Sequence, residues 1–190
     1  MKTIIIGLSG KIGSGKTTLA EFLKEELRKI DIPVQFINFA DALKKITYEL
    51  SGHYGFTQED KQFYLEDWGM TVGTMLQKLG TDVMRNYFDN QVWVKAAFSK
   101  IKEGVNIIGD CRFKNEAIAI KQKEGILIRV NGDPGKIREN STRDINHISE
   151  IELDNYDGFD FIFENNGSKE ALAEFAKETV TKLYQQINER

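Results

Sequence analysis

Short runs of apolar residues alternate with amphipathic stretches along the whole chain. A continuous apolar run, typical of a strand buried on both faces, lies at residues 3–8, and further short β-rich runs lie at residues 34–39, 105–109, 126–130 and 159–163. Apolar residues recur at helical spacing over residues 16–30, 40–50, 115–124 and 169–188. Residues 57–104 contain no strand pattern, and their spacing predicts two or three helices. Such alternation predicts an α/β fold, a parallel sheet with helices on both faces.

The pattern gives no sign of a domain boundary. The chain contains no internal repeat and no low-complexity linker, and its 190 residues suit one domain better than two. A polar stretch at residues 131–147, with a turn cluster from Gly132 to Gly135, is the main interruption. We therefore expect a single domain over residues 1–190.

Composition narrows the class of protein without indicating an activity. Hydrophobic residues make up 41% of the chain and charged residues 29%, which is ordinary for a globular domain. The net charge of −3 argues against nucleic-acid binding but leaves it open. One cysteine, Cys111, cannot form an intramolecular disulfide, so we expect a reducing, cytoplasmic environment. The apolar run Ile4 to Ile6 is too short for a signal peptide or a membrane span.

Residues Gly10 to Thr17 match the phosphate-loop pattern G-x-x-x-x-G-K-[ST]. Glycines let the backbone curl so that its N–H groups point at phosphate oxygens, and the following helix adds its positive dipole end. Lys16 is expected to reach the β- and γ-phosphates of ATP, and the Thr17 hydroxyl to bind Mg²⁺. The expected ATP-binding residues are Gly10, Gly13, Ser14, Gly15, Lys16, Thr17 and Thr18.

A phosphate loop occurs in kinases, GTPases and several classes of ATPase, so further features must decide between them. The chain has little room for the machinery of a motor or helicase ATPase. It also lacks the Asn-Lys-x-Asp segment with which GTPases read guanine. A small kinase is the class that remains most natural.

An acidic and a basic residue follow the third predicted strand. Asp110 stands at the carboxyl end of that strand, the edge of the sheet where the phosphate loop lies, and can hold Mg²⁺ there. Arg112 can bind a phosphate in a forked geometry. The alternative is an aspartate that caps the next helix and an arginine that is a surface charge.

Residues 129–143 are locally basic within an acidic chain. They contain four basic residues, namely Arg129, Lys136, Arg138 and Arg143, against two acidic residues. We expect a short lid over about residues 131–147 that closes over the transferring phosphates and excludes water. A solvated loop is the alternative.

Four stretches are distinctive when taken together: the phosphate loop and residues 76–95, 110–116 and 147–150. The second combines Leu-Gly-Thr-Asp at 79–82 with Trp-Val-Lys at 93–95, a pairing more specific than a phosphate loop alone. With Asn-Asn-Gly-Ser at 165–168, they resemble the deoxynucleoside monophosphate kinases of large tailed bacteriophages. The resemblance covers about residues 3–175.

This resemblance implies ATP-dependent phosphorylation of a deoxynucleoside 5′-monophosphate to the diphosphate. It implies a P-loop kinase fold of three layers, with a five-stranded parallel sheet of order 2-3-1-4-5 counted along the chain. A helical region at about residues 40–103 would bind the acceptor. ATP and Mg²⁺ would be the cofactors and small nucleotides the partners, in the host cytoplasm if a phage encodes the protein, and a homodimer is compatible.

The resemblance also assigns roles to single residues. Lys16, Asp110, Arg112 and Asp41 would be catalytic, with Thr17 and Asp110 at the metal. Residues 39–44 resemble a segment of dephospho-coenzyme A kinases, in which the aspartate corresponding to Asp41 lies near the acceptor hydroxyl. Arg138 would contact ATP, and the expected acceptor-binding residues are Asp41, Lys44, Asp82, Arg85, Trp93, Arg112 and Arg143.

Some alternatives stay open at this point. Trp93 lies on an apolar helical stripe, so it can be a core residue as well as a base-stacking platform. His147 can act as an acid or anchor the return of the lid. The acceptor can instead be dephospho-coenzyme A, a nucleoside or a hydroxymethylated base in DNA. A non-catalytic ATP sensor would be expected to lack the Asp-x-Arg pair and the lid arginines, which this chain has.

Overall fold

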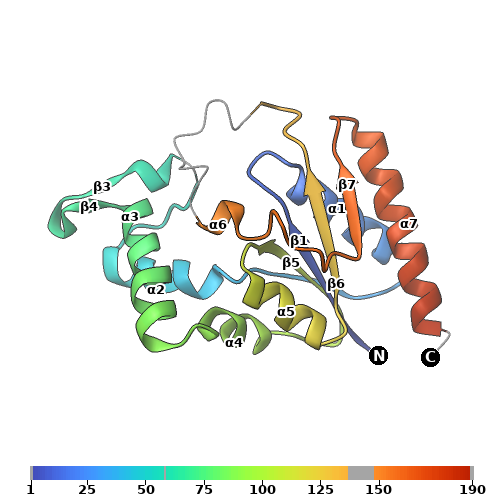
Figure 1. Cartoon of the computed structure of the whole chain (residues 1–190), viewed down its shortest axis with the longest axis horizontal. Helices are drawn as coiled ribbons and strands as arrows, with labels where there is room; N and C mark the ends of the chain where they lie inside the picture. The colour runs from blue at the N-terminus through green and yellow to red at the C-terminus, as the bar shows by residue number, and fades with distance from the viewer. Residues whose placement is uncertain (1, 58, 137–147, 189–190) are drawn as a thin grey trace. The chain divides into compact units, whose positions relative to one another are not determined.

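A five-stranded sheet forms the centre of one of two compact units in the computed structural model (Figure 1). The structure describes residues 2–57, 59–136 and 148–188. We call Met1–Ile37 together with Ile101–Arg190 the sheet unit, and Asn38–Lys100 the helical unit. The strands of the sheet are β1 (Thr3–Ser9), β2 (Val34–Ile37), β5 (Gly104–Cys111), β6 (Ile126–Asn131) and β7 (Phe161–Glu164).

All pairings in this sheet are parallel, and the strand order is β2-β5-β1-β6-β7. Counted along the chain among these five strands, the order is 2-3-1-4-5, so the expected topology is confirmed. The five apolar runs of the sequence correspond to the five strands. The structure ends β2 at Ile37, two residues before the end of its run, whereas β7 begins two residues later and ends one residue later than its run.

Helices cover both faces of the sheet and form the expected three layers. Helices α1 (Lys16–Arg28) and α7 (Lys169–Asn188) share one hydrophobic cluster with one sheet face, whose fully buried members include Leu23, Ile107 and Ile128. Helix α5 (Lys114–Gln122) packs on the other face. There Gly7 leaves room for the Ile120 side chain, because a Cβ would lie 2.5 Å from Ile120 Cδ1.

A buried asparagine ties together the amino-terminal end of β5. Asn106 is 1% exposed, and its Nδ2 donates to the carbonyl oxygens of Lys102 and Ile4 at 2.8 and 3.3 Å. Its Oδ1 accepts from Gln35 Nε2 at 3.2 Å and from the Lys102 backbone N–H at 3.1 Å. Buried amides need such partners, and these secure the end of the sheet opposite to the phosphate loop.

The carboxyl ends of three neighbouring strands meet at one edge of the sheet. Ser9, the last residue of β1, is paired with Cys111 of β5 on one side and with Arg129 of β6 on the other. The phosphate loop begins at the next residue, Gly10. This register places Asp110 and Arg112 beside the start of the loop, at the edge where parallel α/β sheets bind ligands.

The helical unit contains α2 (Asp41–Ser51), α3 (Val72–Gln77) and α4 (Val92–Phe98). It also contains a small antiparallel hairpin, β3 (Tyr64–Leu65) and β4 (Met70–Thr71). The 3₁₀ turn η1 (Asp60–Gln62) precedes the hairpin, and the 3₁₀ turn η2 (Glu66–Trp68) connects its two strands. The expectation that residues 57–104 lack strands is therefore wrong. Strands of two residues are too short to produce an alternating pattern.

Helix α3 continues directly into a π-helix, η3 (Lys78–Phe88). The apolar spacing predicts helix here, which is confirmed, but it does not distinguish the wider π form. The backbone N–H of Asp89 donates to the Met84 carbonyl five residues back, at 2.8 Å. Long π-helices are rare, and π geometry is frequent at functional sites. This one contains Leu-Gly-Thr-Asp at 79–82 and Arg85.

The remaining described segments are short. Residues 131–136 end β6 and form the expected turn, in which the Lys136 N–H donates to the Asp133 carbonyl at 2.9 Å. The expected lid at 131–147 lies outside the described residues from 137 onward. Helix α6 (Ile148–Ile151) follows. Among the helices that the structure describes, none has the length and apolar character needed to cross a membrane.

Candidate active site

The phosphate loop adopts a conformation that requires its glycines. Gly10, Gly13 and Gly15 have φ values of 150°, 78° and 96°, in the region that residues with a Cβ rarely adopt. A Cβ at Gly10 would overlap the Val130 carbonyl oxygen and lie 2.6 Å from Ser14 Oγ. Gly10 therefore permits a close approach of the loop to β6.

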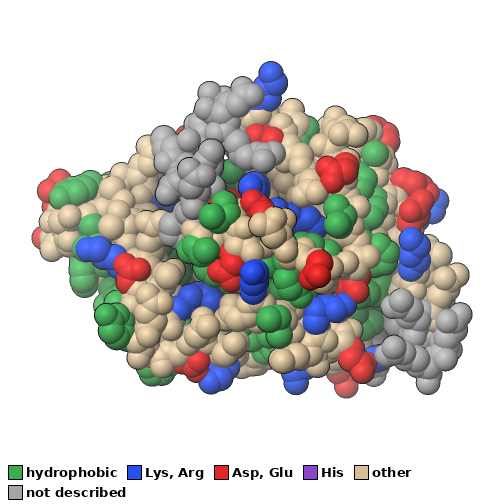
Figure 2. Space-filling model, viewed as in Figure 1, with side chains coloured by type: hydrophobic (Ala, Val, Ile, Leu, Met, Phe, Trp, Pro, Cys, Tyr) green, Lys and Arg blue, Asp and Glu red, His purple; other side chains and the backbone are tan. Residues whose placement is uncertain are grey.

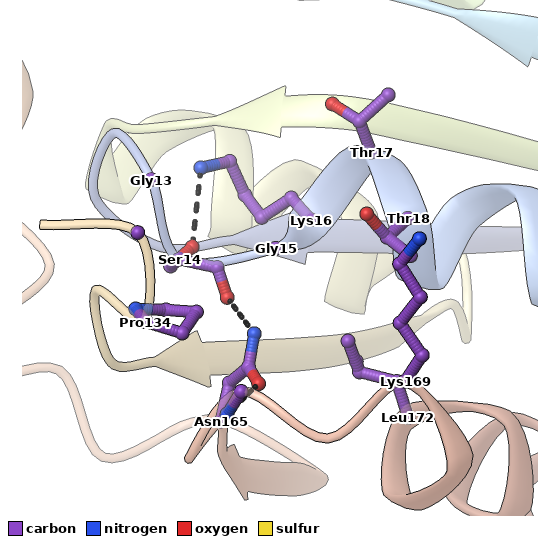
Figure 3. Close-up of a pocket in the computed structure, with 12 residues that line it drawn as sticks. Gly13, Ser14, Gly15, Lys16, Thr17, Thr18, Pro134, Asn165, Lys169 and Leu172 are labelled. Atoms are coloured by element: carbon purple, nitrogen blue, oxygen red, sulfur yellow. Dashed lines mark hydrogen bonds between the residues drawn. The ribbon is translucent and has the colours of Figure 1, made fainter. Parts of the chain in front are cut away.

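The Lys16 side chain turns back over the loop from the first residue of α1 (Figure 3). Its Nζ donates to the carbonyl oxygens of Gly10 at 2.7 Å and Lys11 at 2.8 Å, and lies 3.5 Å from Ser14 Oγ. The loop thus holds a cationic amine at its own rim, beside the backbone N–H groups at the start of α1. Such an arrangement attracts anions.

A cavity of about 390 Å³ opens at the phosphate loop and extends between the ends of α1 and α7 (Figure 3). Its lining comes from three separate segments of the sheet unit. The lining residues are Gly13, Ser14, Gly15, Lys16, Thr17, Thr18, Pro134, Gly135, Asn165, Gly167, Lys169 and Leu172. The volume lies within the range of small-molecule sites.

Six of these lining residues had not been expected as site residues: Pro134, Gly135, Asn165, Gly167, Lys169 and Leu172. A signal for two of them was present, because Asn165 and Gly167 belong to the Asn-Asn-Gly-Ser segment that contributes to the resemblance. Pro134 and Gly135 lie in the turn cluster after β6. Lys169 and Leu172 carry no motif and enter the site through the packing of α7 against α1.

Asn165 fastens the phosphate loop to the end of β7. Its Nδ2 donates to the Ser14 carbonyl at 2.9 Å, and its Oδ1 accepts from the Gly167 N–H at 3.0 Å (Figure 3). The side chain is only 5% exposed. A Cβ at Gly15 would overlap Asn165 Nδ2. Loop and asparagine are therefore fitted to one another.

Asp110 lies at the end of β5, and Arg112 and Phe113 connect this strand to α5. Phe113 is the N-cap residue of α5 and has no side-chain acceptor, and Glu116 reaches back to accept from the N–H groups of Phe113 at 3.1 Å and Arg112 at 2.8 Å. Asp110 is therefore not the N-cap of this helix, which was the alternative to a functional role. It stands at the sheet edge described above.

The Arg112 guanidinium is paired with the segment that follows the undescribed residues 137–147. Its Nη1 donates to Glu150 Oε1 and, at 3.4 Å, to the Ser149 carbonyl. The two side chains are 23% and 7% exposed, respectively. The sheet edge thus carries an oriented arginine.

A second charged cluster lies on the other side of the loop. Asp154 pairs with Lys11 Nζ and with Arg129 Nη2, both at 2.7 Å, and Arg129 Nη1 donates to Ser9 Oγ at 3.1 Å. These side chains border a cavity of about 290 Å³. By sequence, Arg129 is grouped with the basic residues of the lid. This grouping is corrected, because Arg129 belongs to β6 and is held there by Asp154.

Figure 2 shows how charge is distributed on one face of the molecule. Lys and Arg side chains alternate there with Asp and Glu side chains over the sheet unit. This agrees with the net charge of −3. On that face, Lys and Arg side chains stand singly or in small groups and form no continuous basic surface.

Cys111 is buried between the candidate active-site residues Asp110 and Arg112. Burial raises the pKa of its thiol well above the ordinary value, the carboxylates of Glu116 and Asp110 raise it further, and Arg129 opposes them. Because the thiolate is the reactive form, a raised pKa means less thiolate at any pH near neutrality. The side chain is therefore a small apolar residue here.

We accordingly predict that Cys111 resists alkylation in the folded protein. At pH 8, iodoacetamide should label the native chain far more slowly than the chain unfolded in urea, by about 100-fold or more. Intact-mass spectrometry over time measures both rates. Stoichiometric labelling of the folded protein at the rate of the unfolded one would contradict this prediction.

The helical unit contains five other expected acceptor-binding residues. Asp41 begins α2, where its two carboxylate oxygens accept from the Asn38 backbone N–H at 2.9 Å and from Asn38 Nδ2 at 3.1 Å. Lys44 lies one turn further along and is partly buried. Asp82 is exposed and Arg85 partly buried, both on the π-helix.

Trp93 is a core residue in this structure. It is 3% exposed, and its indole Nε1 donates to the Gly80 carbonyl of the π-helix at 2.9 Å. A ring without an exposed face cannot stack on a base, so the expectation of direct substrate contact by Trp93 is corrected to support of the π-helix. Arg138, Arg143 and His147 lie outside the described residues.

Two comparisons with known sequences point to the same family. A family model described as deoxynucleotide monophosphate kinase matches residues 34–176. A protein of Acanthamoeba polyphaga mimivirus that carries the name of a deoxynucleotide monophosphate kinase is 34% identical over 204 aligned residues, covering 97% of this chain and 94% of that protein.

Solved structures show the same fold at low identity. Shikimate kinase from Aquifex aeolicus superposes with a TM-score of 0.54 at 18% identity, covering 97% of this chain and 98% of that one. A gluconokinase from Sinorhizobium meliloti gives 0.52 at 12% identity, covering 98% and 96%. The family model and the mimivirus relative decide the family, and this chain belongs to the deoxynucleotide monophosphate kinase family of phosphotransferases.

Proposed function

We propose that this chain transfers the γ-phosphoryl group of ATP to the 5′-phosphate of a deoxynucleoside monophosphate. One observation carries the proposal: the glycine-formed loop holds the Lys16 amine at the rim of a nucleotide-sized cavity. In a deoxynucleotide monophosphate kinase, that cavity is the natural site of the phosphoryl donor.

In this proposal the triphosphate lies in the loop. The N–H groups of Gly13 to Thr18 bind phosphate oxygens, and Lys16 exchanges its bonds to the Gly10 and Lys11 carbonyls for bonds to the β- and γ-phosphates. The nucleoside end occupies the remainder of the cavity. Leu172 gives it an apolar wall, and Asn165 keeps the loop in register with that wall.

The expected Mg²⁺ would be held by the Thr17 hydroxyl and the Asp110 carboxylate. Among the described residues, no group of three or more His, Cys, Asp or Glu side chains could form a metal cage. Magnesium needs no such cage, because it is commonly held by one or two protein oxygens together with substrate phosphates and water. When bound, it would neutralise charge on the transferring phosphate.

The acceptor-binding roles rest on the resemblance and on the residues already placed. We assign Arg112 to the phosphates between donor and acceptor, and Asp41, Lys44, Asp82 and Arg85 to the acceptor. The helical unit, Asn38–Lys100, would be the acceptor-binding part of one kinase domain. Arg138 and Arg143 would act from the lid, as expected from the sequence. We place the reaction in the cytoplasm, that of the host if a phage encodes the protein.

A substrate panel tests the proposal. The full chain is incubated with ATP and Mg²⁺ and each common dNMP or NMP, and products are separated by ion-exchange chromatography. We expect at least one dNMP to yield its diphosphate, and EDTA to stop the reaction. Turnover of none of these monophosphates would contradict the proposal, and dephospho-coenzyme A, nucleosides and hydroxymethylated DNA would then be tested as acceptors.

A further inference from the structure

The ion pair between Arg112 and Glu150 is unevenly exposed. The Glu150 side chain is 7% exposed and that of Arg112 23%, so the glutamate is nearly enclosed while part of the arginine side chain remains open to solvent. The two residues come from different segments, β5–α5 and α6. Only Nη1 of the guanidinium takes part, through Glu150 Oε1 and the Ser149 carbonyl.

This pairing uses Nη1 of the guanidinium and leaves the edge formed by Nη2 and Nε available for a ligand. Nη2 and Nε hydrogen-bond to none of the described residues. Together they form the side-on fork of an arginine, which matches two oxygens of one phosphate. A carboxylate fixed on Nη1 prevents rotation about the terminal bonds that would turn this fork away.

The backbone beneath Arg112 is held as well. Glu116 is 2% exposed and accepts from the backbone N–H groups of Arg112 and Phe113. Arg112 is thus anchored at its main chain by Glu116 and at its head group by Glu150. An arginine held at both ends loses less conformational freedom on binding a phosphate.

We infer that Glu150 is a positioning residue of the phosphoryl transfer, which holds Nη1 so that the Nε–Nη2 fork of Arg112 faces a substrate phosphate. The inference rests on the proposed role of Arg112 in phosphate binding. It adds a residue that touches no substrate and acts through the arginine. The competing explanation is an ion pair that only stabilises the fold. If Glu150 positions the arginine, the effect of removing Glu150 requires the Nε–Nη2 fork, and if the ion pair is purely structural it does not.

A double-mutant cycle separates them. Glu150→Ala should lower kcat about 10- to 100-fold with a small change in the KM for ATP. Glu150→Gln, which keeps an acceptor oxygen for Nη1, should restore kcat to within about threefold of wild type. Arg112→Lys removes the fork and should itself lower kcat. In that background, Glu150→Ala should cost no more than about twofold further.

The control is Glu26→Ala, which removes a surface ion pair with Lys29 on α1 and should leave kcat unchanged. Thermal unfolding of each variant reports whether it folds. If Glu150→Ala does not fold, Glu150→Asp replaces it, because the shorter carboxylate cannot reach Nη1 and should lower kcat at least about fivefold.

Two results would overturn the inference. The first is a loss of kcat on Glu150→Ala that is equally large with arginine and with lysine at position 112. Such a result would mean that the ion pair acts on the fold and not through the fork. The second is normal turnover by Arg112→Lys, which would remove the fork from the mechanism. Neither result would contradict the proposed function. That function fails only if the wild-type chain phosphorylates no deoxynucleoside monophosphate.

Discussion

Replacing Lys16 with methionine is expected to lower kcat by about 1,000-fold or more while the protein stays folded. The amine lies over the loop, and it would follow the γ-phosphate as negative charge redistributes in the transition state. Its present partners are two main-chain carbonyls of the loop, Gly10 and Lys11. Water can replace a partly buried amine at these carbonyls, so the free energy of unfolding should fall by only about 1 kcal/mol.

Steady-state kinetics of diphosphate formation and a urea unfolding curve measure the two effects. Lys24→Met is the matched control, because Lys24 lies on the same helix and pairs with Glu21 at the surface. It should retain wild-type kcat. Near-normal turnover by Lys16→Met would show that the phosphate loop does not serve the transferred phosphate as proposed.

The sheet and the loop could be predicted from the sequence because their signals are local. The central strands β1 and β5 are rich in apolar residues and almost wholly buried, whereas the edge strands β2 and β7 are only partly buried and are recognised by their β-branched and aromatic residues. The phosphate loop is specified by glycines at fixed spacing, and the structure shows why, since Gly10, Gly13 and Gly15 all have positive φ. The strand order came from the resemblance, because no local pattern encodes which strands become neighbours.

Other features depend on contacts between distant residues, and the motifs that contain these residues do not say which partners they have. Asn165 and Ser14 are 151 positions apart, and Glu150 and Arg112 are 38 apart. The role of Trp93 in the helical unit is likewise not decided by the sequence. Its apolar stripe fits a core residue or a stacking platform, and only its burial and its bond to Gly80 decide for the core.

Gly10→Ala should disable the phosphate loop, although it adds a single methyl group. The residue has a φ of 150°, and the new Cβ would overlap the Val130 carbonyl oxygen, which belongs to the backbone of β6 and cannot rotate away. The loop must then leave β6, and the carbonyl of Gly10 that positions Lys16 moves with it. We expect the affinity for ATP to fall about 100-fold or more. The free energy of unfolding should fall by about 2–4 kcal/mol, from backbone strain and overpacking together.

The variant Gly52→Ala is a control that introduces backbone strain at a positive φ without steric overlap. Gly52 follows α2 with a φ of 69°, and a Cβ there would have no atom within 4 Å. This variant should lose only about 1 kcal/mol of unfolding free energy and bind ATP like the wild type. Isothermal titration calorimetry with ATP and urea unfolding of both variants give the comparison. If Gly10→Ala binds ATP as tightly as Gly52→Ala, the close approach of the loop to β6 is not what shapes the donor site.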